Sequence, residues 1–70
     1  MRYTVIIEQG PASYGAYVPD LPGCIAAGET RDEVERLIRE AIDQHLELLR
    51  TTGEPIPEPT SAAIEVEAAA

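Results

Sequence analysis

The stretch AYVPDLPGCIAAGET, residues 16–30, decides the fold that this sequence predicts, because it joins two short apolar runs through a proline-rich turn and then opens a helix. Its LPGC portion fits a type II turn, with proline at the second position and glycine at the third, where φ must be positive. Pro19 ends the preceding strand, since proline cannot donate a hydrogen bond to a sheet. We expect Asp20 to accept backbone hydrogen bonds within the loop and Leu21 to turn back against the core. The predicted turn motif consists of Pro19, Asp20, Leu21, Pro22, Gly23 and Cys24.

Cys24 is the only cysteine and His45 the only histidine, which excludes an internal disulfide and a Cys/His metal cluster. A nucleophilic Cys24 would need His45 as its base, and nothing in the sequence brings the two together. The simpler interpretation of Cys24 is a small buried hydrophobe. We therefore expect no catalytic residue, metal or cofactor.

Outward from the turn, residues 3–8, 14–18 and 24–29 are predicted to be strands of an antiparallel meander. Side chains alternate along a strand, so Tyr3, Val5 and Ile7 share one face of residues 3–8, and Thr4, Ile6 and Glu8 share the other. We expect a helix to cover the face of Tyr3, Val5 and Ile7.

Residues 31–51 are predicted to form one long amphipathic helix, because their apolar residues recur at spacings of three and four. Thr30 and Glu33 form a capping box at its start, and Gly53 ends it. After a proline-rich spacer, the alternation of AIEVE predicts a fourth strand over residues 63–67. The predicted fold is thus one α+β domain over residues 1–70, of order β-β-β-α-β, with a small, mostly antiparallel sheet and one helix on one face.

A chain of 70 residues builds only a thin core, and chains of this size usually need a disulfide, a metal or a partner subunit. The predicted helix is longer than its sheet, so its last turns should overhang. Leu46, Leu48 and Leu49 lie in this overhang, which favours a homo-oligomer, a dimer or larger.

Thirteen acidic and five basic residues, none of them lysine, give a net charge of −8. This charge argues against direct nucleic-acid binding and suits a basic protein partner, although an acidic surface also serves solubility alone. The apolar run VII is too short for a signal peptide or a membrane span. A single free cysteine fits a reducing compartment better than a secreted protein, so these features together predict a cytoplasmic protein.

A β-β-β-α-β order is also the opening half of a ribonuclease H-like fold, whose nucleases hold metal ions through converging carboxylates. The nearest available carboxylates are Glu8, Glu40, Glu65 and Glu67. Glu40 is explained as the i,i+4 partner of Arg36. Glu65 and Glu67 are explained as the solvated face of the predicted last strand. A degenerate metal-dependent nuclease therefore stays a minor alternative.

The strings YTVIIE (3–8), YGAYVPDLPGCIAAGET (14–30) and RDEVERLIREAI (31–42) resemble the HicB antitoxin family over about residues 3–49. The resemblance implies a partial ribonuclease H-like fold without nuclease activity. It also implies binding to a small basic HicA-like toxin that cleaves mRNA, and assembly into dimers or tetramers. HicB antitoxins usually carry a C-terminal DNA-binding segment, and no basic segment follows here, so we expect no direct DNA binding by this chain. An orphan oligomeric scaffold is the alternative function.

Candidate toxin-binding residues are those that an exposed strand or strand end would present. Tyr14 and Tyr17 lie on opposite strand faces, so at most one is core, and an exposed tyrosine is a good interface anchor. Three carboxylates near strand ends, Glu8, Asp20 and Glu29, could meet basic groups, although a solvated side chain is the better explanation of each one taken singly.

Overall fold

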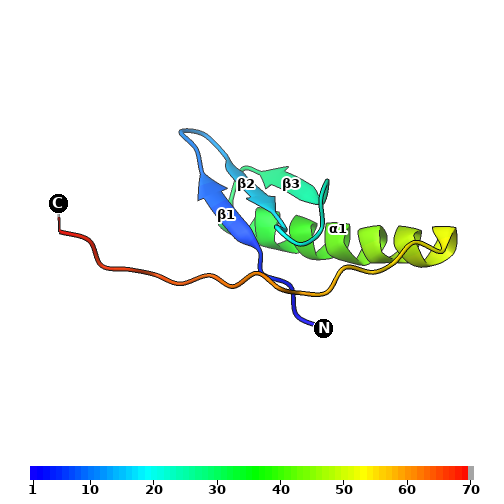
Figure 1. Ribbon diagram of the computed structural model, residues 1–70. Coiled ribbons are helices and arrows are strands. Elements are labelled where there is room, and N and C mark those ends of the chain that lie inside the picture. Colours follow the sequence, from blue (N-terminus) through cyan, green and yellow to red (C-terminus); the bar gives the residue numbers. More distant parts are fainter. Residues whose placement is uncertain (70) are drawn as a thin grey trace.

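A computed structural model describes residues 1–69 and confirms the α+β architecture (Figure 1). Three antiparallel strands in the order β1-β2-β3 are followed by one long helix. Ala70, the last residue of the predicted domain, lies outside the described residues. The elements are β1 (Ile6–Gln9), β2 (Tyr14–Tyr17), β3 (Ile25–Gly28) and α1 (Arg31–Thr52).

Strand β1 starts three residues later than predicted, at Ile6. Its antiparallel partner explains this start, because Ile6 is opposite Tyr17, the last residue of β2. Beyond Tyr17 the chain enters the proline-rich turn, so residues 3–5 have no strand beside them. Pairing, rather than β propensity, therefore sets the length of this strand.

The proline-rich loop, residues 18–24, is built of two successive tight turns. The amide of Leu21 donates to the Val18 carbonyl at 3.0 Å, and the amide of Cys24 donates to the Leu21 carbonyl at 3.0 Å. Gly23 has a φ of 84°, as the third position of a type II turn requires. A further bond from the Val18 amide to the Cys24 carbonyl, at 3.2 Å, closes the loop at its base. These three backbone bonds close the loop on itself, and Leu21 is turned inward.

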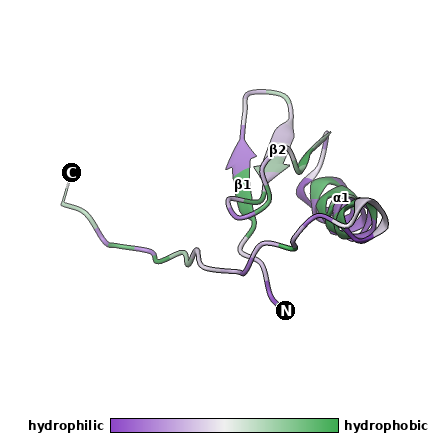
Figure 2. Cartoon of the chain, turned by 45° about the vertical axis from the view of Figure 1, so that its right-hand side comes forward, coloured by the Kyte–Doolittle hydropathy of each residue, from purple (hydrophilic) through white to green (hydrophobic). Residues whose placement is uncertain are grey.

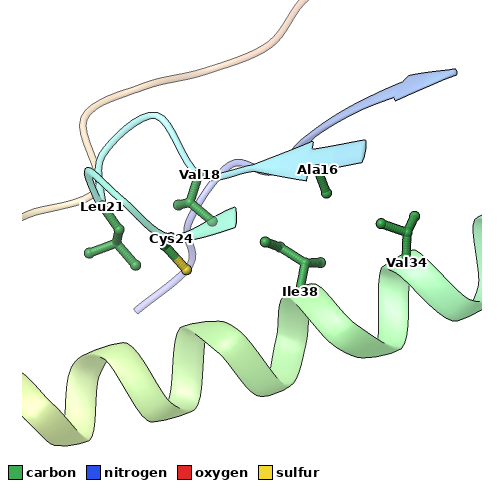
Figure 3. Close-up of a cluster of buried hydrophobic side chains, with 6 residues drawn as sticks. All are labelled: Ala16, Val18, Leu21, Cys24, Val34 and Ile38. Carbon is green, nitrogen blue, oxygen red and sulfur yellow. The ribbon is translucent and has the colours of Figure 1, made fainter. Parts of the chain in front are cut away.

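The core is a single cluster between the sheet, the loop and the first half of α1 (Figure 3). Leu21 and Val34 are its largest fully buried side chains, each 0% exposed. The expected face is confirmed, because Tyr3, Val5 and Ile7 pack against this cluster. The cluster consists of Ala16, Val18, Leu21, Cys24, Val34 and Ile38.

Helix α1 begins at the predicted cap. The Thr30 hydroxyl oxygen accepts from the Glu33 amide at 3.1 Å, and the Glu33 carboxylate reaches back to the Glu29 amide at 3.0 Å. Gly28 allows this close packing, because a Cβ there would lie 2.7 Å from Glu33 Oε1 and 3.2 Å from the backbone nitrogen of Val34. The helix ends at Thr52, one residue after the predicted end, with Gly53 as a left-handed cap.

The helix extends well past the sheet, as predicted (Figure 1). The three leucines of this overhang differ in environment. Leu46 packs against the core cluster and Leu49 is half-buried, so only Leu48, which is 59% exposed, projects into solvent. Burial of Leu46 therefore needs no second subunit.

The predicted strand over residues 63–67 is wrong for this structure, in which residues 62–69 form no strand. The proline segment, residues 54–61, returns from the end of α1 to the start of β1, where the Thr4 hydroxyl donates to the Ser61 carbonyl at 2.8 Å (Figure 1). From there the chain leads away from the sheet, so the AIEVE stretch has no neighbouring strand to pair with. We call residues 62–69 the C-terminal arm.

The expectation for Asp20 is also wrong, because its partners lie 40 residues away rather than within the loop. Its carboxylate accepts from the amides of Thr60 (3.0 Å) and Ser61 (2.9 Å) and from their hydroxyls (3.1 and 2.8 Å). The amides of Val18, Leu21 and Cys24 are bonded to carbonyls of the loop, and the Asp20 carboxylate bonds to the proline segment instead. We call these four bonds the Asp20 clasp.

Candidate protein-interaction surface

The sheet has one covered and one open face. Helix α1 packs on β3 and β2, on one side of the sheet (Figure 2). Because α1 is the one helix among residues 1–69, no helix in this part of the chain covers the opposite side. We call it the outer face, defined by Ile6, Glu8, Gly15, Tyr17, Ile25 and Ala27.

A row of three large apolar side chains crosses the outer face at one level. Tyr17 of β2 is opposite both Ile6 of β1 and Ile25 of β3. Tyr17 is 41% exposed and Ile25 is 71% exposed, whereas Ile6 is half-buried. A tyrosine between two isoleucines offers a flat apolar contact with a hydroxyl at its end, the kind of group that anchors protein interfaces.

The next row on the outer face is small and acidic. Glu8 of β1 is opposite Gly15, and Gly15 is opposite Ala27. With a glycine and an alanine beside it, the Glu8 side chain has no bulky neighbour in its row. The outer face therefore has a row of large apolar side chains beside a row of small residues that ends in the Glu8 carboxylate. A partner with apolar and basic groups would complement both rows.

Two of the predicted toxin-binding residues, Tyr17 and Glu8, lie together on the outer face, and the other three lie elsewhere. Tyr14 is on the covered face, half-buried against the core. The carboxylate of Asp20 is occupied by the Asp20 clasp, and hydrogen bonds from Ser61 and Thr60 hold its pKa below the ordinary value of 3.8. Glu29 is exposed beside the start of α1.

The sequence analysis missed Ile6 and Ile25 as members of this surface. Ile6 could have been found, because period-two alternation already placed it opposite Val5 and Ile7. Ile25 needed the register of β3 against β2, which residue types alone do not define.

The basic residues of the helix are largely used in local ion pairs. Arg31 pairs with Glu35 at 3.1 Å, and Arg36 pairs with Glu40 at 3.3 Å as expected. Arg50 also pairs with Glu47, at 3.3 Å. These exposed pairs add little stability, but they leave an acidic excess over the whole chain.

Catalytic interpretations gain no support from the geometry. Cys24 is 3% exposed, and burial raises the pKa of its thiol, which disfavours the thiolate that a nucleophile requires. In residues 1–69, no three His, Cys, Asp or Glu side chains converge to hold a metal ion. Over the same residues, no helix has the length and apolar character needed to cross a bilayer.

Comparison with known proteins agrees with the fold and places it in a family. The model of the HicB-like antitoxin of bacterial toxin–antitoxin systems matches residues 3–69. A UPF0150 protein of Thermoplasma acidophilum is 41% identical over 69 residues, covering 97% of this chain and 100% of that protein. A UPF0150 protein of Synechocystis is 37% identical over 57 residues, covering 80% of this chain and 72% of that protein.

A solved structure carries the same fold. A chain of a HicA3 and HicB3 toxin–antitoxin complex superposes with a TM-score of 0.73 and 32% identity, covering 86% of this chain and 70% of that chain. The match of the family model extends through the turn, the helix and the C-terminal arm. This chain therefore belongs to the family of HicB-like antitoxins of bacterial toxin–antitoxin systems.

Proposed function

We propose that this chain is a non-catalytic antitoxin that binds and neutralises a small basic, mRNA-cleaving HicA-like toxin through its outer face. The observation that carries the proposal is the row of Ile6, Tyr17 and Ile25 on the face opposite α1, with Tyr17 and Ile25 exposed, on a chain of net charge −8. Family membership and the likeness to a chain from a HicA3 and HicB3 complex support the choice of partner. A toxin that cleaves mRNA works in the cytoplasm, where we place this chain as well.

The physical basis is a combination of apolar burial and charge. Burying Tyr17 and Ile25 against a partner removes their apolar surface from water, and this supplies the affinity. The acidic chain attracts a basic toxin at long range and speeds the encounter, so raising the salt concentration should slow association. A ribonuclease whose basic RNA-binding surface lies against this chain is blocked without any chemistry.

The experiment uses the full-length chain and a HicA-like protein encoded in the same genome, with binding and RNA cleavage measured together. We expect stoichiometric binding and loss of cleavage. Tyr17→Ala should weaken binding by at least about tenfold, as expected for a buried aromatic anchor. Leu48→Ala is the matched control, because Leu48 is a comparably exposed apolar side chain on α1 rather than on the outer face.

Two outcomes contradict the proposal. If Leu48→Ala weakens binding and Tyr17→Ala does not, the toxin docks on the helix overhang instead of the outer face. If no HicA-like protein binds and cleavage continues, the orphan scaffold is the better description.

A further inference from the structure

The C-terminal arm leaves two β-branched side chains in solvent. Ile64 is 85% exposed and Val66 is 74% exposed, and they alternate with the exposed Glu65 and Glu67. Side chains two residues apart share one face of an extended chain, so this stretch has one apolar and one acidic side. Such a pattern is stable as a half-buried strand and unfavourable in isolation.

Strand β1 has an open edge that could receive such a strand. The sheet order β1-β2-β3 leaves one side of β1 without a neighbour among residues 1–69, and its backbone groups there are unpaired with any strand. Helix α1 packs on β3 and β2 but not on β1 (Figure 2). Val5 and Ile7 are therefore only half-buried, although they pack against the core cluster. A strand added at this edge would bring its apolar side chains beside Val5 and Ile7.

The edge of β3 is a poorer acceptor. Immediately after β3 the chain enters the cap of α1, where Glu33 and Val34 lie against Gly28. A strand that ran along this edge past Gly28 would collide with the first turn of α1. The open edge of β1 is therefore the acceptor that the fold favours.

The arm does not reach the β1 edge of its own chain along its present course. The Asp20 clasp and the bond from Thr4 hold Ser61 beside the start of β1, and from there the arm runs away from the sheet (Figure 1). To lie along its own β1, the arm would have to bend sharply directly after Ser61. Residues 62–67, AAIEVE, which follow Ser61, contain no Gly, Pro, Asn, Asp or Ser, the residues that dominate tight turns. A second copy can receive the arm without such a bend.

We propose that residues 62–67 form a strand on the β1 edge of a second copy of this chain, and that the two copies exchange their arms around a two-fold axis. Such an exchange places Ile64 and Val66 next to Val5 and Ile7 of the other copy and leaves Glu65 and Glu67 in solvent. The Asp20 clasp holds Thr60 and Ser61 in place, and so fixes the point from which each arm extends towards the other copy. The proposal does not depend on toxin binding.

The first test is the mass of the full-length chain in solution, measured by light scattering over a range of concentrations. We expect a dimer, and the double variant Ile64→Asp, Val66→Asp should raise its dissociation constant at least about tenfold, because it removes two apolar contacts per arm. These residues are exposed within their own chain, so the helical circular dichroism signal of α1 should be unchanged in the variant. Leu48→Asp is the control for dimerisation through the helix overhang and should leave the dimer intact.

The second test identifies which copy supplies the arm. A dimer mixed from methyl-labelled and unlabelled chains should show intermolecular nuclear Overhauser effects between the methyls of Ile64 or Val66 and those of Val5 or Ile7. The proposal is overturned by a monomer at all concentrations, by contacts found only within one chain, or by a dimer that Leu48→Asp dissociates and the arm variant does not.

Salt separates this proposal from the proposed function. Two copies of net charge −8 repel each other, so salt should strengthen the dimer, whereas it should slow binding of a basic toxin. If the chain binds the toxin but forms no dimer, the exchanged arm is refuted and the proposed function stands. If the chain forms the dimer but does not bind the toxin, the proposed function is refuted and the exchanged arm stands.

Discussion

Residues 18–24 and residues 54–61 are both rich in proline, but the first segment closes its backbone hydrogen bonds within itself, whereas the second is held by residues far away in the sequence, Asp20 of the first segment among them. The loop closes two turns on its own backbone and buries Leu21 at 0% exposure. The proline segment is instead held by the Asp20 clasp and by the Tyr3 hydroxyl, which donates to the Pro57 carbonyl at 2.6 Å. Proline stiffens both, but only in the loop do neighbouring residues supply the hydrogen-bond partners.

This difference predicts that the two segments contribute unequally to stability. The loop is part of the core, so damage to it should lower the free energy of unfolding of the whole chain. The proline segment lies on the surface, so damage to it should release that segment and the arm while the sheet and α1 stay folded.

The largest effect is expected from Leu21→Ala. Truncating a fully buried leucine leaves a cavity and removes apolar contacts, which costs about 2–5 kcal/mol. Urea denaturation followed by circular dichroism measures this loss. Leu48→Ala, at an exposed leucine, should change stability by no more than about 0.5 kcal/mol. Equal losses in the two variants would show that the loop is not anchored in the core.

The next effect is expected from Gly23→Ala. Gly23 has a φ of 84°, and an added Cβ meets nothing within 4 Å, so the cost comes from the backbone alone. We expect a loss of about 1 kcal/mol or more in urea denaturation. Gly15→Ala is the control, because Gly15 has no positive φ and its Cβ would make an ordinary contact at 4.0 Å. No difference between the two variants would rule out the type II turn.

A local effect is expected from Asp20→Ala. The variant removes the acceptor of four hydrogen bonds, so the Thr60 and Ser61 amides should exchange with deuterium much faster. The urea midpoint should shift far less than in Leu21→Ala. Glu58→Ala, at an exposed carboxylate of the same segment, should leave both amides protected. If the sheet amides lost protection to the same extent, the proline segment would be part of the core.

The smallest change is expected from acid. Hydrogen bonds from Ser61 and Thr60 lower the pKa of Asp20 in the folded chain below 3.8, so their stabilisation is present above that pH. It is lost as the pH falls through the lowered pKa of the folded state. Protection of the Thr60 and Ser61 amides, corrected for intrinsic exchange, should therefore decline below pH 3.8. In Asp20→Asn this acid step should be absent, and its persistence would assign the step to another carboxylate.

The fold could be predicted from local patterns wherever the partner of a residue is near in sequence. The capping box at Thr30, the helix stripe and the turn at Gly23 all depend on spacings of a few residues. The structure confirms the cap, the helix and the positive φ of Gly23, and the helix ends one residue after its predicted end. The start of β1 was misplaced because it depends on where β2 ends. The candidate surface was predicted in part, since Tyr17 and Glu8 were among the candidates although the sequence did not choose between Tyr14 and Tyr17, whereas Ile25 required the strand register.

By itself, the sequence determined the meander, the turn, the long helix, the acidic charge and the resemblance to HicB antitoxins, because each follows from residue types at short spacing. Only the tertiary structure decided which acceptor holds Thr60 and Ser61, and that the alternating stretch 63–67 stays outside the sheet of its own chain. Alternation describes a strand that needs a partner, but it does not specify the partner. Hydrogen bonds between residues 40 apart depend on where the whole chain places their ends, and no local pattern encodes that placement.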